Sequence, residues 1–559
     1  MVTLGSRSRQ WLLRGHRNDV ETRSVRSSTA EAMTIARVGI AAAAATYLLL
    51  ALTWSLVTPA LWGTDESSNA AYGALLAHGQ WPTIDTPKAA ATLLGLEERA
   101  AFDARLGATW RDDIWTAHQP PLYYALAGTV SRATSVMWGP TAGLLGARIL
   151  TVLCGLGGVV ATALLALSAF PSRPQVAVLA SGLVALTPTI PHYAGQVYAD
   201  ALVFTLCTAA FVITARITRD GPASRPVLAL VAVWTLLAVT KASGAAAVGI
   251  GIVAAAVWWL MVARRERAPM AWRPSRRWWV ATGLLLAIAA APYAVNLVRY
   301  GEPIGSQAVI AKVGRTAGDH GWLATLGDPT FWIYPLDLLL LETSEVVPEV
   351  VPEVFPRVLW GWRLILVEPL LVGLVLVWSR LRRASDGDVI DLRRWASLLA
   401  PAAGCVALVV LSVAWIVDGG TVHARYYFPA AALLGLGLAW TCAALGRWSV
   451  IAGAVLVAAM TGATVHLFRM FHASVAWLER SGRQDLPTLV ADPWRVAPIV
   501  LGLAGVGAVC MLACYALASS SATTIAEESQ LSRRTPVQTD TKPAGPTRKR
   551  RRNGAVTTD

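Results

Sequence analysis

Charged side chains are scarce in this chain of 559 residues, since Asp, Glu, Lys and Arg together make up 15% of it. Soluble domains carry about a quarter. The hydrophobic share is 55%, and apolar runs such as 38–57 and 496–517 exceed the roughly 18 residues typical of a bilayer-spanning helix. The shortage of charge therefore excludes an ordinary soluble domain and indicates an all-α integral membrane protein.

Cysteine is also sparse, and its placement excludes two further classes of protein. All six cysteines fall inside apolar runs, so the sequence offers neither a disulfide framework in its polar loops nor the CxxC spacing of a metal site. Cys510 and Cys514 are separated by one helical turn. We interpret the cysteines as small residues that pack between membrane helices.

A short, cleavable signal peptide is not expected either. About 35 mostly polar, Arg-rich residues precede the first apolar run, which is too long for the charged start of a signal peptide. In a soluble protein the net charge of +14 would suggest nucleic acid, but here the positive residues lie in short loops and in the two ends. The charge therefore reports membrane topology, and no nucleic-acid partner is expected.

Hydropathy predicts about twelve transmembrane helices within a membrane domain at 38–517. The predicted spans are 38–58, 146–169, 175–190, 199–216, 226–240, 245–263, 278–297, 363–379, 395–416, 425–445, 448–468 and 496–517. Residues 1–37 form a basic cytoplasmic segment in this scheme. Residues 518–559 form a basic cytoplasmic tail whose Ser, Thr and Pro content is typical of disorder.

The positive-inside rule supports this order of spans in the cell membrane. With both termini in the cytoplasm, the Arg-rich loops 216–225, 264–277 and 380–394 all fall inside, and only the loop 469–495 is a basic exception outside. The apolar segment 122–138 contains an arginine and would invert every later loop if it crossed. We interpret it as an amphipathic helix on the outer membrane surface. Two large extracytoplasmic loops, 59–145 and 298–362, then face outward.

Three cations stand at the outer membrane edge, where the topological bias disfavours them. Arg148 opens the second predicted span, Lys241 ends the fifth and Arg425 opens the tenth. A cation held at the edge of the bilayer suggests an anionic partner. Lipid phosphate and a nearby carboxylate both remain open as that partner, and Tyr426 could flank a lipid head group.

Carboxylate side chains are also expected at the outer edge of the membrane. Asp65 and Glu66 follow the first span, and such a pair can bind a divalent metal through its oxygens or supply a general base for a hydroxyl group. An adjacent acidic pair is also common on solvated loops. Asp200 opens the fourth span, where it could instead cap the helix.

The segment 118–124, His-Gln-Pro-Pro-Leu-Tyr-Tyr, precedes the predicted surface helix. Two prolines fix the chain there, which aims His118 and Gln119 at whatever lies above the membrane, with Tyr123 close behind. A lone histidine is more often structural than catalytic. Arg299 closes the seventh span on the same outer side.

The ordered combination of these motifs resembles the GT-C superfamily of membrane glycosyltransferases, and within it an uncharacterised bacterial, actinobacterial-type branch. Members show an Asp-Glu pair after the first span, a His-Pro-Pro-Leu-Tyr-Tyr-like segment, a polar motif ending in Asp, a Lys-x-Ser-Gly-like step and an Arg-Tyr-x-x-Pro start to a late span. This chain offers matches at 65–66, 118–124, 196–200, 241–244 and 425–429. It departs from the pattern at Asn69, where members carry a histidine.

The resemblance implies transfer of a sugar from a polyprenyl-phosphate-linked donor to a cell-envelope acceptor on the extracytoplasmic face. It implies Asp65 as base, Glu66 in support or on a divalent metal, and Arg425 with Lys241 and Tyr426 at the donor phosphate. Other predicted substrate-binding residues are His118, Gln119, Tyr123, Asp200 and Arg299. The departure at Asn69 bears on metal use and activity.

Two other classes remain open. A multispan transporter shares the helix count, although transporters usually place ionisable residues near the bilayer midplane and often show repeats, and neither is found here. A non-catalytic membrane partner in cell-envelope assembly is the second. The large outer loops favour an enzyme that works at the membrane surface.

Overall fold

The computed structural model describes residues 5–97, 99–100, 112–265, 274–315, 321–337, 355–383, 392–421, 423–480 and 487–534. The chain divides into two compact units. The first comprises 1–29 and 520–559, of which 5–29 and 520–534 are described and helical. The second, 30–519, contains the predicted membrane domain and every site discussed below.

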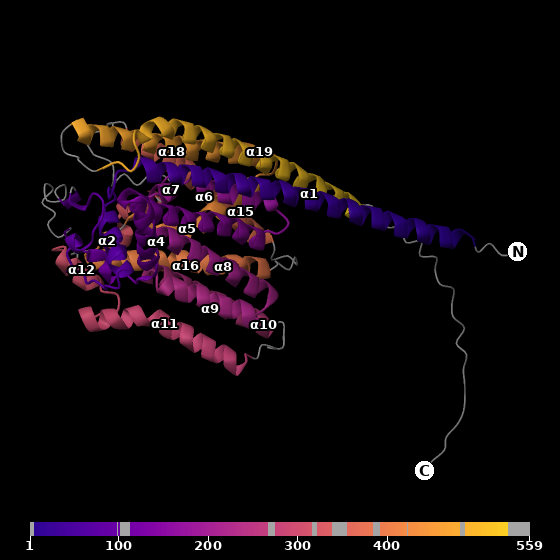
Figure 1. The fold of residues 1–559 in the computed structure, drawn as a ribbon. Coiled ribbons are helices and arrows are strands. Elements are labelled where there is room, and N and C mark those ends of the chain that lie inside the picture. The colour runs from indigo at the N-terminus through magenta and orange to yellow at the C-terminus, as the bar shows by residue number, and fades with distance from the viewer. Residues whose placement is uncertain are drawn as a thin grey trace, which may run out of the picture. The chain divides into compact units, whose positions relative to one another are not determined.

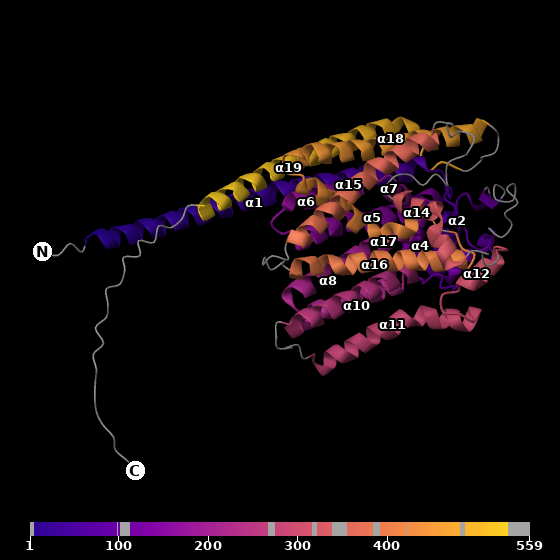
Figure 2. The same cartoon turned by 180° about the vertical axis from the view of Figure 1, so that it is seen from behind.

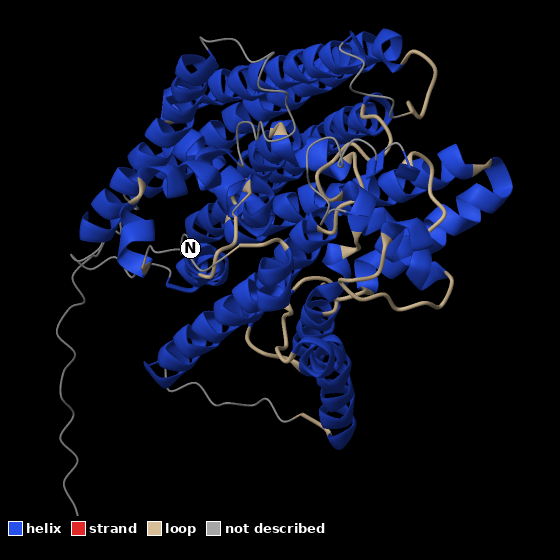
Figure 3. Ribbon diagram, turned by 90° about the vertical axis from the view of Figure 1, so that its left-hand side faces the viewer, coloured by secondary structure: helices blue, strands red, loops and turns tan. Residues whose placement is uncertain are grey.

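The described residues are helical and contain no strand, and the single isolated β-bridge joins Pro87 to Asp113 (Figure 3). The helices are α1 (Gly5–Val57), α2 (Glu66–Ala77), α4 (Leu122–Trp138), α5 (Pro140–Ala169), α6 (Pro174–Leu186), α7 (Thr189–Ala194), α8 (Asp200–Asp220), α9 (Ser224–Ala238), α10 (Ala242–Arg265), α11 (Arg276–Tyr300), α12 (Ser306–Lys312), α13 (Trp322–Gly327), α14 (Pro329–Asp337), α15 (Phe355–Arg383), α16 (Leu392–Val417), α17 (Phe428–Ala444), α18 (Ser449–Arg480) and α19 (Pro493–Arg534).

The expected fold class, an all-α integral membrane protein, is confirmed. Among the described residues, nine helices are long and apolar enough to cross a bilayer, in α1, α5, α8, α10, α11, α16, α17, α18 and α19. Two predicted spans correspond to the shorter apolar helices α6 and α9, and a third falls within α15. The count of twelve crossings and the orientation of the termini stay predictions.

Two boundaries differ from those predicted. The span expected at 175–190 breaks after Leu186, because Thr187 precedes a proline and takes extended backbone angles, so that α7 starts as a separate short helix. At the other end of the chain, α19 continues to Arg534, into the segment predicted to be disordered. The remaining tail, 535–559, lies outside the described residues.

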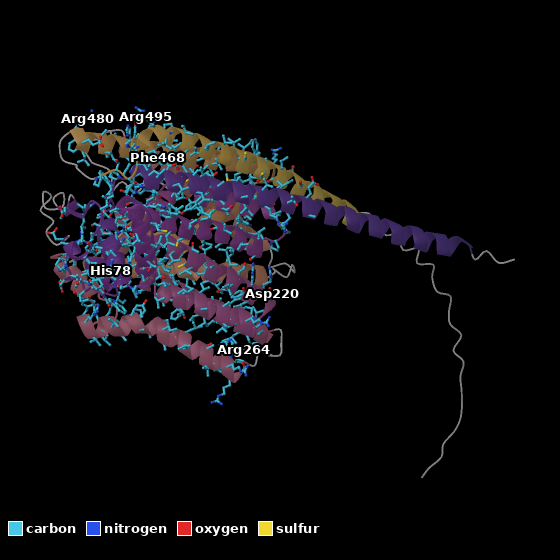
Figure 4. The ribbon with its side chains drawn as sticks, viewed as in Figure 1. His78, Asp220, Arg264, Phe468, Arg480 and Arg495 are labelled. Atoms are coloured by element: carbon cyan, nitrogen blue, oxygen red, sulfur yellow. The ribbon has the colours of Figure 1, made fainter. Side chains whose placement is uncertain are left out.

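The helices of the second unit run side by side, and one end of this bundle gathers the elements that build the site. Helices α2 and α12 lie together at that end in both views (Figures 1 and 2). His78 lies at the same end, whereas Asp220 and Arg264 lie at the opposite one (Figure 4). Arg480 and Arg495, which border the loop that breaks the positive-inside pattern, lie at the end with His78.

Helix α4 has the bounds predicted for the surface helix and packs between α2 and α5. Its approach to α2 depends on two glycines, because a Cβ on Gly128 would come within 1.8 Å of the Gly73 carbonyl oxygen. Only glycine permits such close contact of two helix backbones. This contact fixes the first outer loop against the bundle, while the predicted position of α4 on the membrane surface remains a prediction.

Candidate active site

Asp65 is presented by a tight turn between α1 and α2. Leu61 in this turn has a φ of 56°, which is unusual for a residue other than glycine. The buried Arg99 donates from Nη1 to the carbonyl oxygens of Leu61 and Trp62, at 2.7 and 2.6 Å. The Asp65 amide donates to the Tyr198 hydroxyl at 3.2 Å. Arg99 therefore braces the turn, a role that nothing in the sequence marks, because it is one charged residue among several in that loop.

Glu66 is held by Arg148 of α5, and both side chains are completely buried. The guanidinium donates to both carboxylate oxygens at 2.8 Å, and its remaining donors reach carbonyl oxygens of Ser55, Thr58 and Pro59 at the end of α1. This bidentate pair ties α5 to α1 and to the start of α2. Glu66 lines neither cavity described below.

Asp65 forms an ion pair with Arg425, which lies 360 positions later in the chain. Both side chains are nearly buried, with exposures of 10% and 4%. The Arg425 guanidinium also lies over the rings of Tyr198, Tyr193 and Tyr426, at 4.6, 5.5 and 5.6 Å from their centroids. Of the two partners that the sequence left open for Arg425, the structure shows the carboxylate.

A second ion pair joins Lys241 to Asp200 at 2.6 Å. The Lys241 ammonium group also lies 5.1 Å from the centre of the Tyr426 ring. Asp200 makes no capping hydrogen bond, because Ala199 occupies the N-cap position of α8. The carboxylate is therefore turned towards the cavity instead of towards its own helix.

His118 and Gln119 lie beside the two ion pairs Asp65–Arg425 and Asp200–Lys241. His118 is hydrogen-bonded through Nδ1 to the Trp115 carbonyl oxygen at 2.9 Å, so the proton sits on Nδ1 and Nε2 is left as an acceptor. Burial lowers the pKa of His118, which keeps the ring neutral at pH 7. The Gln119 side-chain oxygen accepts from the Tyr124 hydroxyl at 2.5 Å.

Two cavities meet at these residues. The smaller, about 70 Å³, is lined by Asp65, Asn69, His118, Asp200, Lys241 and Arg425 among others. The larger, about 290 Å³, extends between apolar residues of α10, α11 and α16. Both are lined by His118, Gln119, Lys241, Trp415 and Tyr426. The geometry is that of an apolar groove that leads to a small, charged chamber.

Two predicted substrate-binding residues lie elsewhere. Tyr123 is fully buried and bonded to the Thr151 hydroxyl, and its neighbour Tyr124 lines the small cavity instead, because successive helix residues point about 100° apart. Arg299 donates to the Pro82 carbonyl oxygen at 2.9 Å and stacks near Trp81, away from both cavities. Arg299 therefore connects the end of α11 to the segment between α2 and α4.

The carboxylates do not suit a divalent metal in this arrangement. Asp65 and Glu66 each face an arginine and point to different partners. No group of three or more His, Cys, Asp or Glu side chains that could hold a metal occurs among the described residues. Asn69, which replaces the histidine of the resembling family, donates to the Val197 carbonyl oxygen at 2.8 Å. These residues give a metal no ready set of oxygen ligands.

Two residues that line the small cavity each have one side-chain polar atom without a hydrogen-bond partner. The Arg425 Nε and the Asn69 Oδ1 are both buried and unsatisfied. Both residues line the cavity, and one atom is a donor whereas the other is an acceptor. A buried polar atom without a partner costs about 1–3 kcal/mol, and a ligand that supplies the missing bond recovers that energy.

Helix α12 covers the small cavity. Val309 lines it, and Gly305, with a φ of 72°, lies so close to His118 that a Cβ would come within 2.8 Å of the histidine Cβ. Lys312 at the end of the helix bridges Asp85 and Asp113 of the first outer loop, at 2.7 Å each. Although partial burial lowers the pKa of Lys312, the hydrogen bonds to both carboxylates outweigh this effect and raise it.

We expect Lys312→Met to loosen this cover. Loss of this partly buried bridge costs about 1 kcal/mol, so amides of 305–315 should exchange hydrogen roughly fivefold faster. Asp113→Asn should have a smaller effect, and Asp85→Asn, whose side chain is 74% exposed, the smallest. Hydrogen-exchange mass spectrometry of the purified protein checks this order, and equal exchange in all four proteins would show that the bridge does not hold α12.

Comparison with known proteins adds little detail. No family model and no curated protein sequence matches the chain. Among solved structures, ArnT from Cupriavidus metallidurans bound to undecaprenyl phosphate is similar with a TM-score of 0.43 and 14% identity, over 87% of this chain and 77% of that one. Its apo state gives 0.43 and 15%, over 85% and 75%. The function of this chain must therefore be inferred from its own site.

Proposed function

We propose that the chain is a GT-C-type membrane glycosyltransferase. It would transfer a sugar from a polyprenyl-phosphate-linked donor to a cell-envelope acceptor on the extracytoplasmic face. The observation that carries the proposal is the chamber around Arg425 and Lys241 at the end of an apolar groove. A lipid phosphate has the same division, an apolar chain that ends in an anionic head.

Each part of the donor would contact residues of complementary polarity or charge. The polyprenyl chain would lie against α10, α11 and α16, where the larger cavity is lined by Leu408 and Leu411. Lys241 lines both cavities, so it would meet the phosphate where groove and chamber join. The unsatisfied Arg425 Nε would donate to a phosphate oxygen. The unsatisfied Asn69 Oδ1 would accept from a sugar hydroxyl.

The reaction follows from these positions. The acceptor hydroxyl oxygen would attack the anomeric carbon of the sugar and form the new glycosidic bond, while its proton passes to the Asp65 carboxylate. The bond between the anomeric carbon and the phosphate oxygen breaks, and its electron pair leaves with the phosphate. Arg425 and Lys241 would stabilise that developing negative charge. No metal is needed to balance these charges.

The transporter alternative is less well supported by the structure. Five of the six charged side chains in these ion pairs lie in the turn after α1 or at the starts of α2, α8, α10 and α17, and the sixth, Arg148, lies in the third turn of α5. Ionisable residues of secondary transporters are usually found near the middle of the membrane. This arrangement supports a site near the membrane surface more than a transport path through the middle of the membrane.

Native mass spectrometry of the detergent-purified protein tests the proposal. We expect a polyprenyl-phosphate lipid to co-purify with the wild type and to be lost from Arg425→Ala, because the variant lacks a buried cation at the phosphate. Arg447→Ala is the matched control, since Arg447 is exposed beside Trp448 beyond the other end of α17, and this variant should keep the lipid. Retention of ordinary phospholipids alone by the wild type would contradict the proposal and favour the transporter or partner classes.

A further inference from the structure

The charges around the small cavity are balanced before any ligand binds. Asp65 pairs with Arg425, Glu66 with Arg148, and Asp200 with Lys241. His118 is the neutral member of the group, because burial lowers its pKa. An anion that enters the chamber therefore finds each of these three cations already paired with a carboxylate.

The three ion pairs differ in how readily an entering anion could break them. Arg148 is fully buried, lines neither cavity, and donates to three backbone carbonyls besides Glu66. Lys241 has three N–H donors, of which Asp200 receives one, so it can bind an anion and keep its partner. Neither pair has to break when a phosphate arrives.

The pair of Arg425 and Asp65 is different. Its ionic hydrogen bond runs from a single guanidinium nitrogen, Nη2, to one carboxylate oxygen, whereas arginine and carboxylate at their best form two parallel bonds. Nε of Arg425, which such a fork-like arrangement would use, is buried without a partner. The guanidinium is therefore incompletely satisfied by Asp65, and a phosphate that approached both Nε and Nη2 would bind it better.

We propose that the donor phosphate and Asp65 compete for Arg425. In the resting site Arg425 holds the Asp65 carboxylate, which is then unavailable as a base. When the phosphate takes over the guanidinium, the carboxylate is released and can accept the proton of the acceptor hydroxyl. The base is thus unmasked only when a donor is bound. This inference rests on the proposed function.

The competition predicts an unusual property of Asp65: its removal should strengthen donor binding. In a site where Asp65 held a metal or a sugar hydroxyl, its removal would weaken binding instead. The expected gain for Asp65→Asn is about tenfold in Kd, which corresponds to the loss of one competing charge-assisted hydrogen bond. Asp65→Ala should shift Kd in the same direction.

The test is a titration of the purified full-length protein with undecaprenyl phosphate, in detergent, with and without EDTA. Wild type, Asp65→Asn, Asp65→Ala and the control Asp220→Asn are compared, because Asp220 is 59% exposed at the opposite end of the bundle. Melting temperatures recorded without lipid confirm that each variant is folded, and the alanine variant serves if the asparagine variant is not. We expect tighter binding by both Asp65 variants, unchanged binding by Asp220→Asn, and no effect of EDTA.

The outcomes separate the two proposals. If the wild type binds the lipid, and the Asp65 variants bind it equally or more weakly, the competition is refuted while the proposed function stands. Weaker binding in EDTA would also refute it, because a metal would then link the carboxylate to the phosphate. If neither the wild type nor any variant binds the lipid, the proposed function fails and the competition fails with it.

Discussion

Replacing Arg148 with methionine is expected to lower the free energy of unfolding by about 3–5 kcal/mol, the usual cost of breaking a buried ion pair from one side. Glu66 would remain as a charge in a site with no exposure and without its bidentate partner. Three carbonyl groups at the end of α1 would lose their donors at the same time. The junction of α1, α2 and α5 should therefore tolerate substitution less well than the rest of the candidate active site.

Thermal denaturation in detergent measures this effect, and the chain supplies a matched control. Arg219 and Asp220 form a pair with the same 2.8 Å separation, but their side chains are 44% and 59% exposed. Arg219→Met should therefore cost less than about 1 kcal/mol. The double variant Glu66→Leu with Arg148→Met should recover part of the loss, since it leaves no unpaired charge. Equal melting temperatures for Arg148→Met and Arg219→Met would contradict the structural role of the buried pair.

The second large effect is expected on turnover. Asp65→Asn should lower kcat by about 10²–10⁴-fold, because the amide cannot accept the proton of the acceptor hydroxyl. The same variant should bind the donor phosphate more tightly, so kcat and affinity should change in opposite directions. Few other roles of a carboxylate produce that combination, and a merely structural residue would weaken both.

Turnover can be followed without knowledge of the sugar. Mass spectrometry of lipid extracts measures the release of free polyprenyl phosphate from polyprenyl-phosphate-linked sugars in membranes that contain each variant. Asp220→Asn, at the opposite end of the bundle, should match the wild type. Unchanged release by Asp65→Asn would exclude Asp65 as the base and direct attention to the Nε2 of His118, which lines the same cavity and has the proton on its other nitrogen.

The sequence alone determined the class of fold and the set of positions worth examining. The free-energy cost of burying charge in lipid is large, so apolar runs and Arg-rich loops reveal helices without knowledge of their packing. The same cost confines ionisable residues to helix ends, and for this reason Asp65, Asp200, Lys241 and Arg425 could be singled out before their contacts were known.

Only the tertiary structure decided which of these groups are partners. Asp65 and Glu66 are neighbours in sequence, yet Asp65 lines the small cavity and pairs with Arg425, whereas Glu66 lies away from it and pairs with Arg148, because α2 begins between them. Tyr123 and Tyr124 are separated in the same way by the turn of α4. Spacing along the chain carries no information about Arg425, which reaches Asp65 from 360 positions away only because the turn before α17 packs against the turn after α1. Pairing of charges depends on that packing, and the sequence supplies only the charges.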